Sequence, residues 1–239
     1  MAGTRLFRTT RARLRAAYGR FMTMMGRLAV LAALSACSSE GYDTGDGSLS
    51  WLRCDFAVAY TDASRQVQRL VTDDGATITP SQGVSAQWML TPDSAYRVQA
   101  YYDSQTSRVV SLAQVLTLQP VGADQVSDRK ADPLKYESIW LSANGQYVNM
   151  GLGVKAGTTQ DADAALQRLW LVDMGVSLRA DGRTTHTFQL CHDQAGVPQY
   201  YTVRQYVSVP TQGIQADSMS IIVPTYSGTH TATIGMPRR

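Results

Sequence analysis

The sequence predicts an all-β protein that consists of a small closed barrel followed by an immunoglobulin-like β-sandwich. Two observations support this prediction. From Trp51 onward, short segments alternate apolar and polar residues, which is the period of a half-buried strand. Turn signals rich in Gly, Asp and Asn separate these segments, and only residues 160–166 show a weak helical pattern.

The first part of the chain is typical of a lipoprotein signal. Arg27 closes a basic segment, residues 28–34 are a short apolar run, and residues 34–37 (Leu-Ser-Ala-Cys) form a lipobox. In a lipobox, the cysteine thiol carries a diacylglycerol thioether after cleavage. A transmembrane helix needs about 20 apolar residues, and this run supplies roughly half that number. We therefore expect residues 1–36 to be a signal peptide and the mature protein to begin at lipidated Cys37, its anchor in the membrane.

The signal also bears on compartment and charge. Ser38 is not the aspartate that retains lipoproteins in an inner membrane, so we expect the outer membrane, on either its periplasmic or its cell-surface face. The seven arginines of the leader precede Cys37 and all 19 Asp and Glu follow it, so the net charge of +3 becomes −4 in the mature chain. The sequence therefore predicts no nucleic-acid partner, because such a partner needs a clustered cationic face.

The basic leader is long, and a true start at Met22, Met24 or Met25 is an alternative.

The mature chain is expected to contain a tether and two domains. Residues 37–50 are rich in Gly, Ser and Asp with almost no apolar content, which is typical of a flexible linker. The two domains are expected to span residues 51–125 and 126–239. Between them lies a hinge in the polar, charged segment 122–133, which ends in Pro133.

The first domain is predicted to hold five short strands. Residues 52–60 place Leu, Cys, Phe, Val and Tyr on one face, and the segment TDDGAT (72–77) contains an Asp-Gly turn that leads into Ile78. The other strands are expected at residues 67–72, 96–102 and 108–118. Five strands in about 70 residues suit a closed barrel better than half of a sandwich.

The second domain is predicted to hold seven strands. Turns are expected at the segments ANGQ, ADGR and DQAGVP. Seven strands in about 105 residues is the size of a sandwich domain. The strands are expected at residues 138–141, 147–154, 169–178, 185–191, 200–208, 219–223 and 229–234.

Three stretches, together with the lipobox and the acidic tether, resemble the NigD-like family of Bacteroidetes lipoproteins. They are DDGATITP (73–80), IWLSANGQYVNMGLGV (139–154) and THTFQLCHDQAG (185–196). The most specific residues are Trp140, Gly145, Tyr147 and Asn149, followed by Leu190, His192, Asp193 and Gly196.

The resemblance covers nearly the whole mature chain and implies an OB-like barrel followed by a β-sandwich. It implies no enzymatic activity, and the family name reflects an association with a bacteriocin gene cluster. Two departures stand out: Gln167 and Arg168 precede Leu169 where relatives carry a basic pair and a His, and Pro198 replaces an acidic turn. Neither is expected to change the fold.

The histidines offer one candidate for chemistry. His186 and His192 share parity on one expected strand, and with Asp193 they suggest a zinc or acid–base site. A structural role is favoured, because Asp193 has the opposite parity and no HxH or HExxH spacing exists. We expect His192 and Asp193 to cap a turn, and we expect no metal.

Glycines and aspartates give weaker motifs. Gly151, Gly153 and Gly157 imitate a phosphate-binding loop but lie inside alternating β sequence with no following helix, so we expect them to let neighbouring strands approach closely. Three acidic residues lack the Gly and distal Glu of an EF-hand calcium loop: Asp161, Asp163 and Asp173. No cofactor is expected.

Adjacent tyrosines give the best sign of binding. One residue of each adjacent pair in a strand must face outward, which makes Tyr102 and Tyr201 the candidate ligand-binding residues, for a glycan or an envelope protein. No GxSxG motif, Cys–His dyad or pair of Glu is present. We therefore expect a non-catalytic binding or structural module of the cell envelope. Alternatives are an immunity or envelope-assembly factor and, less favoured, a hydrolase that uses His192 and Asp193.

Two cysteines remain once Cys37 carries the lipid. Cys54 and Cys191 lie in a chain expected to be exported, where a disulfide is stable. They are also expected to lie in different domains, and free buried cysteine is common. The sequence leaves their pairing open.

Overall fold

The computed structural model describes residue 47, residues 50–157 and residues 167–237. The chain from Trp51 onward forms one compact unit. Within the described residues the secondary structure consists of fourteen strands and one short 3-10 helix, η1 (Ala123–Gln125), which confirms the all-β prediction. No helix among these residues is long and apolar enough to span a bilayer. The lipobox with Cys37 and the weak helical segment 160–166 lie outside the described residues.

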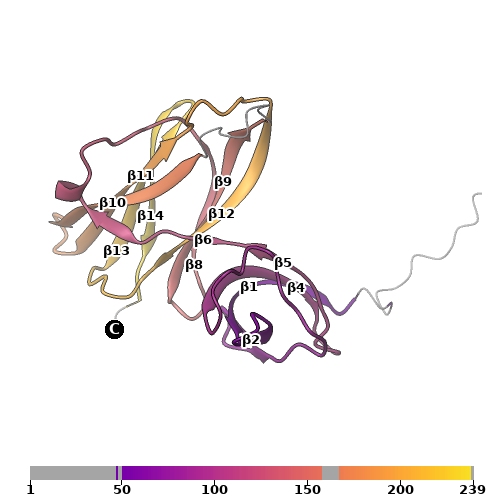
Figure 1. The fold of residues 1–239 in the computed structure, drawn as a ribbon. Helices are drawn as coiled ribbons and strands as arrows, with labels where there is room; N and C mark the ends of the chain where they lie inside the picture. The colour runs from indigo at the N-terminus through magenta and orange to yellow at the C-terminus, as the bar shows by residue number, and fades with distance from the viewer. Residues whose placement is uncertain (1–46, 48–49, 158–166, 238–239) are drawn as a thin grey trace, which may run out of the picture. The chain divides into compact units, whose positions relative to one another are not determined.

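The first five strands form one antiparallel sheet in the order β3-β2-β1-β4-β5. The sheet curls strongly on itself, as Figure 1 shows in purple. After β3, the Ser81 backbone NH donates to the Ser107 carbonyl at 3.1 Å, and Gln82 Nε2 donates to the Val109 carbonyl at 3.3 Å, which brings the two ends of the sheet together. The strands are β1 (Leu52–Thr61), β2 (Val67–Thr72), β3 (Thr77–Ile78), β4 (Ala95–Asp103) and β5 (Val109–Gln114).

The inner face of β1 differs from the sequence prediction. The residues that point into the barrel core are Ala57 and Ala59, both 0% exposed, rather than the larger Phe56 and Val58. Small side chains suit this position because a five-stranded barrel has little internal room. Phe56 points outward instead and packs on aromatic rings of the sandwich. Alternation identified the strand but not which face was inner, since both faces are covered.

The second half of the chain forms two sheets. One has the order β14-β13-β11-β10-β7 and the other the order β6-β12-β9-β8; Figure 1 shows them as two layers. Between the layers lies a core of fully buried apolar side chains that includes Met150, Phe188 and Ile221. The strands are β6 (Leu116–Thr117), β7 (Pro120–Gly122), β8 (Lys135–Leu141), β9 (Tyr147–Ala156), β10 (Arg168–Leu178), β11 (Thr184–Asp193), β12 (Tyr201–Pro210), β13 (Ser218–Thr225) and β14 (Gly228–Gly235).

The chain passes from barrel to sandwich earlier than the sequence predicts. Residues 116–122 were expected in the barrel, but β6 pairs with β12 and β7 pairs with β10, and Leu118 between them belongs to the sandwich core. The expected single strand over residues 108–118 is broken at Val115, whose backbone NH donates to the Arg97 carbonyl at 3.0 Å. Alternation continues through this break, so the local pattern did not reveal it.

The segment expected to be a hinge is attached to the sandwich. Ala131 forms a parallel bridge with His192, and Leu134 forms another with Thr225. The Asp132 backbone NH donates to the His192 carbonyl at 3.1 Å. The segment is polar because it lies on the surface, yet its backbone is partly satisfied by strand β11, so polarity alone did not mark a hinge.

The predicted turns are confirmed. Gly75 in the Asp-Gly turn has φ +90°, and Gly182 in the ADGR turn has φ +77°, a region that residues with a Cβ rarely enter. These turns fix the pairing of β2 with β3 and of β10 with β11.

Candidate binding site

A buried polar network joins the barrel to the sandwich. Arg97 on β4 has a side chain only 2% exposed and binds the carboxylate of Asp73 with both terminal nitrogens at 2.6 Å. Its Nε donates to Ser208 Oγ of β12 at 3.1 Å, and its Nη2 donates to Asn149 Oδ1 of β9 at 3.2 Å. Ser208 Oγ also donates to Asn149 Oδ1 at 2.6 Å, and Asn149 Nδ2 donates to Asp73 Oδ2 at 3.3 Å. We call these four residues the interdomain network.

Aromatic rings surround this network. The Arg97 guanidinium lies 4.1 Å from the centroid of the Tyr147 ring, a cation–π distance. Phe56 of the barrel meets Trp140 and Tyr206 of the sandwich edge to face, with centroids 5.4 and 5.3 Å apart. Such pairs contribute about 0.5–1.5 kcal/mol each beyond their burial.

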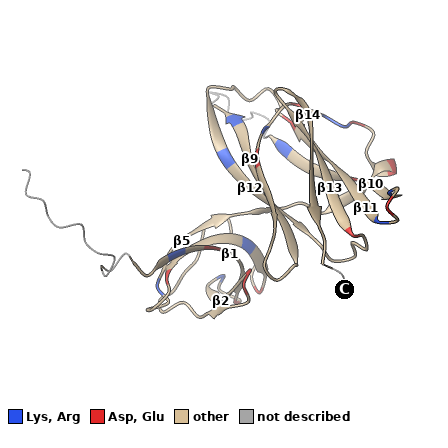
Figure 2. Cartoon of the chain, turned by 180° about the vertical axis from the view of Figure 1, so that it is seen from behind, with Lys and Arg blue, Asp and Glu red and all other residues tan. Residues whose placement is uncertain are grey.

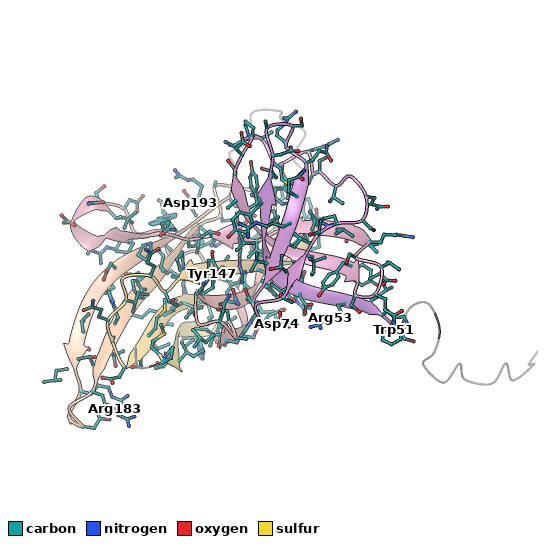
Figure 3. The ribbon with its side chains drawn as sticks, turned by 90° about the horizontal axis from the view of Figure 1, so that it is seen from below. Trp51, Arg53, Asp74, Tyr147, Arg183 and Asp193 are labelled. Carbon is teal, nitrogen blue, oxygen red and sulfur yellow. The ribbon has the colours of Figure 1, made fainter. Side chains whose placement is uncertain are left out.

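The turn that carries Asp73 is itself held in place. The Asn144 backbone NH of the sandwich donates to the Asp73 carbonyl at 2.8 Å. In the same turn, a hydrogen bond from the Thr72 hydroxyl, followed by one from the Ala76 backbone, holds the pKa of Asp74 below its usual range. Figure 3 shows Arg53 beside Asp74, where Nη2 lies 3.6 Å from the carboxylate.

Four residues from the stretches that carry the family resemblance lie in or beside the interdomain network. Asp73 opens the DDGATITP stretch, and Trp140, Tyr147 and Asn149 are the most specific residues of the second stretch. All four lie at the contact between barrel and sandwich. The sequence singled out these residues only through their resemblance to the family, because a contact between two domains leaves no local pattern.

His192 is buried and fully engaged. It is 0% exposed, with Nδ1 3.1 Å from the Asp132 carbonyl and Nε2 3.3 Å from Gln167 Oε1. Asp193 points away from it, pairs with Arg168 at 2.9 Å and accepts a hydrogen bond from the Ala195 backbone at 2.8 Å. The Arg168 hydrogen bond, then that of Ala195, lowers the pKa of Asp193. The expected turn cap is therefore present at Asp193, whereas His192 faces inward.

The other two histidines, His186 and His230, contact neighbouring side chains. His186 Nε2 lies 2.8 Å from Asp173 Oδ1, and the ring stacks on Phe188 with centroids 4.3 Å apart. The His230 ring lies 4.3 Å from Tyr136. In the part of the chain that the structure describes, no three His, Cys, Asp or Glu side chains gather as metal ligands. Asp161 and Asp163 are outside that part.

The glycines of β9 permit close packing, as expected. A Cβ on Gly151 would lie 2.9 Å from Ser138 Oγ, and a Cβ on Gly153 would lie 2.9 Å from Thr202 Cγ2 and 3.0 Å from Lys135 Cβ. Gly157, just after the strand, would bring a Cβ to 2.7 Å from Pro198. These glycines belong to a paired strand and do not form a phosphate loop.

Of the two predicted ligand-binding tyrosines, one is buried. Tyr102 is 3% exposed, belongs to the barrel core and donates a hydrogen bond from its hydroxyl to Asp55 Oδ2 at 2.7 Å. It cannot stack on a ligand, and its neighbour Tyr101 is the more exposed ring. Tyr201 is 52% exposed and Tyr200 is 76% exposed, which leaves this pair accessible.

The two remaining cysteines are free. Cys54 is exposed on the barrel, and Cys191 is buried in the sandwich. Burial raises the pKa of the Cys191 thiol, so this group is not poised for nucleophilic chemistry.

Two adjoining grooves lie where the start of β8 meets the turn between β13 and β14. One, of about 420 Å³, runs between β8 and the turn, and the other, of about 300 Å³, crosses onto β9 and β12. Lys135 and Tyr226 line both, so we treat them as one surface, the Tyr226 groove. Its lining residues are Leu134, Lys135, Tyr136, Gly153, Lys155, Thr202, Thr225, Tyr226, Ser227 and His230.

The Tyr226 groove is basic and carries no acidic lining residue among those described. Figure 2 shows the basic residues of β9 and β12 near one end of these strands. Just outside the groove, Glu137 receives a hydrogen bond from Arg204 Nε at 2.6 Å and another from Lys135 Nζ at 3.1 Å. These two hydrogen bonds, that of Arg204 first, lower the pKa of Glu137. The sequence missed the groove because four segments far apart in the chain form it.

Comparisons with known proteins reveal the same fold in Bacteroidales proteins. No protein-family model and no curated protein matches the sequence. A solved NigD-like immunity protein from Bacteroides caccae matches with a TM-score of 0.55 and 22% identity, over 75% of this chain and 91% of that one. A protein from Parabacteroides distasonis described as toxin-related matches with a TM-score of 0.52 and 16% identity, over 77% and 92% of the chains. One from Bacteroides fragilis described as a lipoprotein matches with 0.51 and 9%, over 78% and 98%.

At these low sequence identities the comparisons show a shared fold, and function has to be argued from the site itself. None of the three proteins is described as an enzyme. The chain therefore has the fold of the solved NigD-like immunity protein from Bacteroides caccae.

Proposed function

We propose that the mature chain is a lipid-anchored, non-catalytic binding or structural module of the outer membrane. The observation that carries this proposal is that the polar side chains considered for catalysis are engaged in contacts within the protein. His192 is 0% exposed and bonded on both ring nitrogens, and Arg97 and Asp73 bind each other in the interdomain network. A general acid or base must reach the substrate within hydrogen-bonding distance, but His192 and Arg97 are buried, and the carboxylate of Asp73, 16% exposed, is bound by Arg97.

Metabolic labelling with palmitate tests the anchor. Wild type should be labelled and found in the outer-membrane fraction, because the thiol of Cys37 is the expected acceptor of the lipid. Cys37→Ala should lose the label, whereas Cys54→Ala should keep it, since Cys54 lies on the folded barrel. Equal labelling of wild type and Cys37→Ala would contradict the anchor.

Substitution of His192 tests the absence of catalysis. His192→Ala should lower the free energy of unfolding by about 1–3 kcal/mol, because it empties a fully buried position and leaves the partly buried oxygens of Asp132 and Gln167 without this hydrogen-bonding group. Residues 38–239 should release no product from glycans or peptides of the envelope, with or without the substitution. A turnover that disappears in His192→Ala would establish a hydrolase instead.

An immunity role is the second candidate, because a neighbour of the same fold is described as a NigD-like immunity protein. A sensitive strain that expresses the full chain should then survive a bacteriocin that kills the parent strain, and Cys37→Ala should remove the protection. Equal killing of the two strains by the bacteriocins of related bacteria would contradict this role.

A further inference from the structure

We propose that the Tyr226 groove binds an acidic polysaccharide through the carboxylates of its sugar units. This inference rests on the proposed non-catalytic function and names its ligand class. The groove contains neither of the two tyrosines that the sequence predicted as ligand-binding, Tyr102 and Tyr201. It combines an exposed aromatic ring with lysine side chains on one accessible surface.

The ring at the centre of the groove is exposed and well supported. Tyr226 is 52% exposed and stands in the β13–β14 turn, where Thr225 Oγ1 donates to the Gly228 carbonyl at 2.5 Å. The Leu134 backbone NH donates to the Pro224 carbonyl at 2.9 Å, which ties this turn to the start of β8. A ring held in this way loses little freedom when a sugar stacks on it, so its apolar face is available for binding at low entropic cost.

The charges of the groove select an anion. Lys155 lines the groove and has no ion-pair partner among the described residues, and Lys135 shares Glu137 with Arg204. Two cations therefore share one carboxylate beside the groove, and Lys155 adds a third cation to its lining. The mature chain carries a net charge of −4, yet at physiological ionic strength only charges within about 8 Å act strongly. A ligand in the groove meets this local positive charge.

The shape and the hydroxyls favour a sugar chain over a compact anion. The two parts of the groove, about 420 and 300 Å³, each fall within the range of about 300–1,000 Å³ typical of ligand pockets. Tyr226 and Lys135 line both parts, so an extended ligand that occupied both would lie against this ring. Thr202 and Ser227 add hydroxyls on the walls, the groups that commonly fix the orientation of a sugar.

Isothermal titration calorimetry of residues 38–239 with polygalacturonate, alginate and hyaluronan tests the proposal. We expect saturable binding to at least one of these polymers, weaker at 0.5 M NaCl. Tyr226→Ala and Lys155→Gln should each weaken it about tenfold, a loss of about 1.4 kcal/mol. Matched controls are Tyr200→Ala, an exposed ring outside the groove, and Lys130→Gln, a lysine on another surface; both should bind as wild type. Thermal unfolding of each variant confirms that it is folded.

Three results would overturn the proposal. They are binding to none of the three polymers, equal binding of a carboxyl-reduced polymer, and unchanged affinity in both groove variants. Preferential binding to phosphatidylglycerol vesicles would assign the groove to a lipid surface and would also contradict it. The same samples are assayed for new reducing ends, whose appearance would contradict the non-catalytic function and leave the binding site standing.

Discussion

Arg97 is a cation with a side chain only 2% exposed, and such a group needs partners that replace water. It has them on three sides: the carboxylate of Asp73, the oxygens of Asn149 and Ser208, and the face of the Tyr147 ring. Three of these four residues come from strands β9 and β12 of the sandwich, and Asp73 comes from the turn before β3. At the scale of single residues, Arg97 is therefore the centre of the polar part of the contact between barrel and sandwich.

Removal of that side chain gives the largest expected loss of stability. Arg97→Met should lower the free energy of unfolding by about 3–5 kcal/mol, because it leaves Asp73 partly buried without its counter-ion. Arg53→Met, which breaks ion pairs of a half-exposed side chain, should cost much less, because solvent screens those pairs. Urea denaturation of both variants measures the difference, and similar losses would contradict the role assigned to Arg97.

Tyr102 predicts a dependence of stability on alkaline pH. Burial, followed by the hydrogen bond to Asp55, raises the pKa of Tyr102 to about 12. The unfolded hydroxyl ionises near its ordinary pKa of about 10. Between these values the unfolded state binds fewer protons than the folded state, so the free energy of unfolding should fall as the pH rises from about 10 to about 12. Tyr102→Phe should remove this part of the fall in denaturation curves measured across that range; an unchanged slope would refute the assignment.

At the scale of elements, β9 joins the two functions of the sandwich. Its inner residues Val148, Met150 and Leu152 are all 0% exposed in the core. Its outer residues run from Asn149 at the interdomain network, through the glycines, to Lys155 in the Tyr226 groove. One face of one strand therefore connects the barrel contact with the candidate binding surface.

The close packing around Gly153 gives an element-scale prediction. Gly153→Ala should cost about 1–3 kcal/mol, because the new Cβ would lie 2.9 Å from Thr202 Cγ2 and 3.0 Å from Lys135 Cβ, and β8 or β12 would have to move. Gly235→Ala is the matched control, since no atom lies within 4 Å of its Cβ position. Thermal denaturation should separate the two variants, and equal melting temperatures would show that the strands have room at Gly153.

Across the whole molecule, local patterns predicted the strands better than their partners. Every strand expected beyond residue 134 is present with ends shifted by a few residues, because alternation and turn glycines act over short distances. The sequence did not predict that the chain leaves the barrel at Val115, because β6 and β7 pair with distant strands and such pairing produces no local sequence pattern. The same holds for the burial of Tyr102 and for the groove around Tyr226, which depend on segments brought together only by the fold.

Hydrogen exchange in increasing urea, followed by mass spectrometry, tests the central claim that the interdomain network fastens the barrel to the sandwich. In wild type, peptides from β4 and from β9 should lose protection in one shared transition, because the interdomain network links these strands. In Arg97→Met, peptides of the barrel should lose protection at lower urea than those of the sandwich. Separate transitions in wild type, or a pattern in Arg97→Met identical to wild type, would contradict the account.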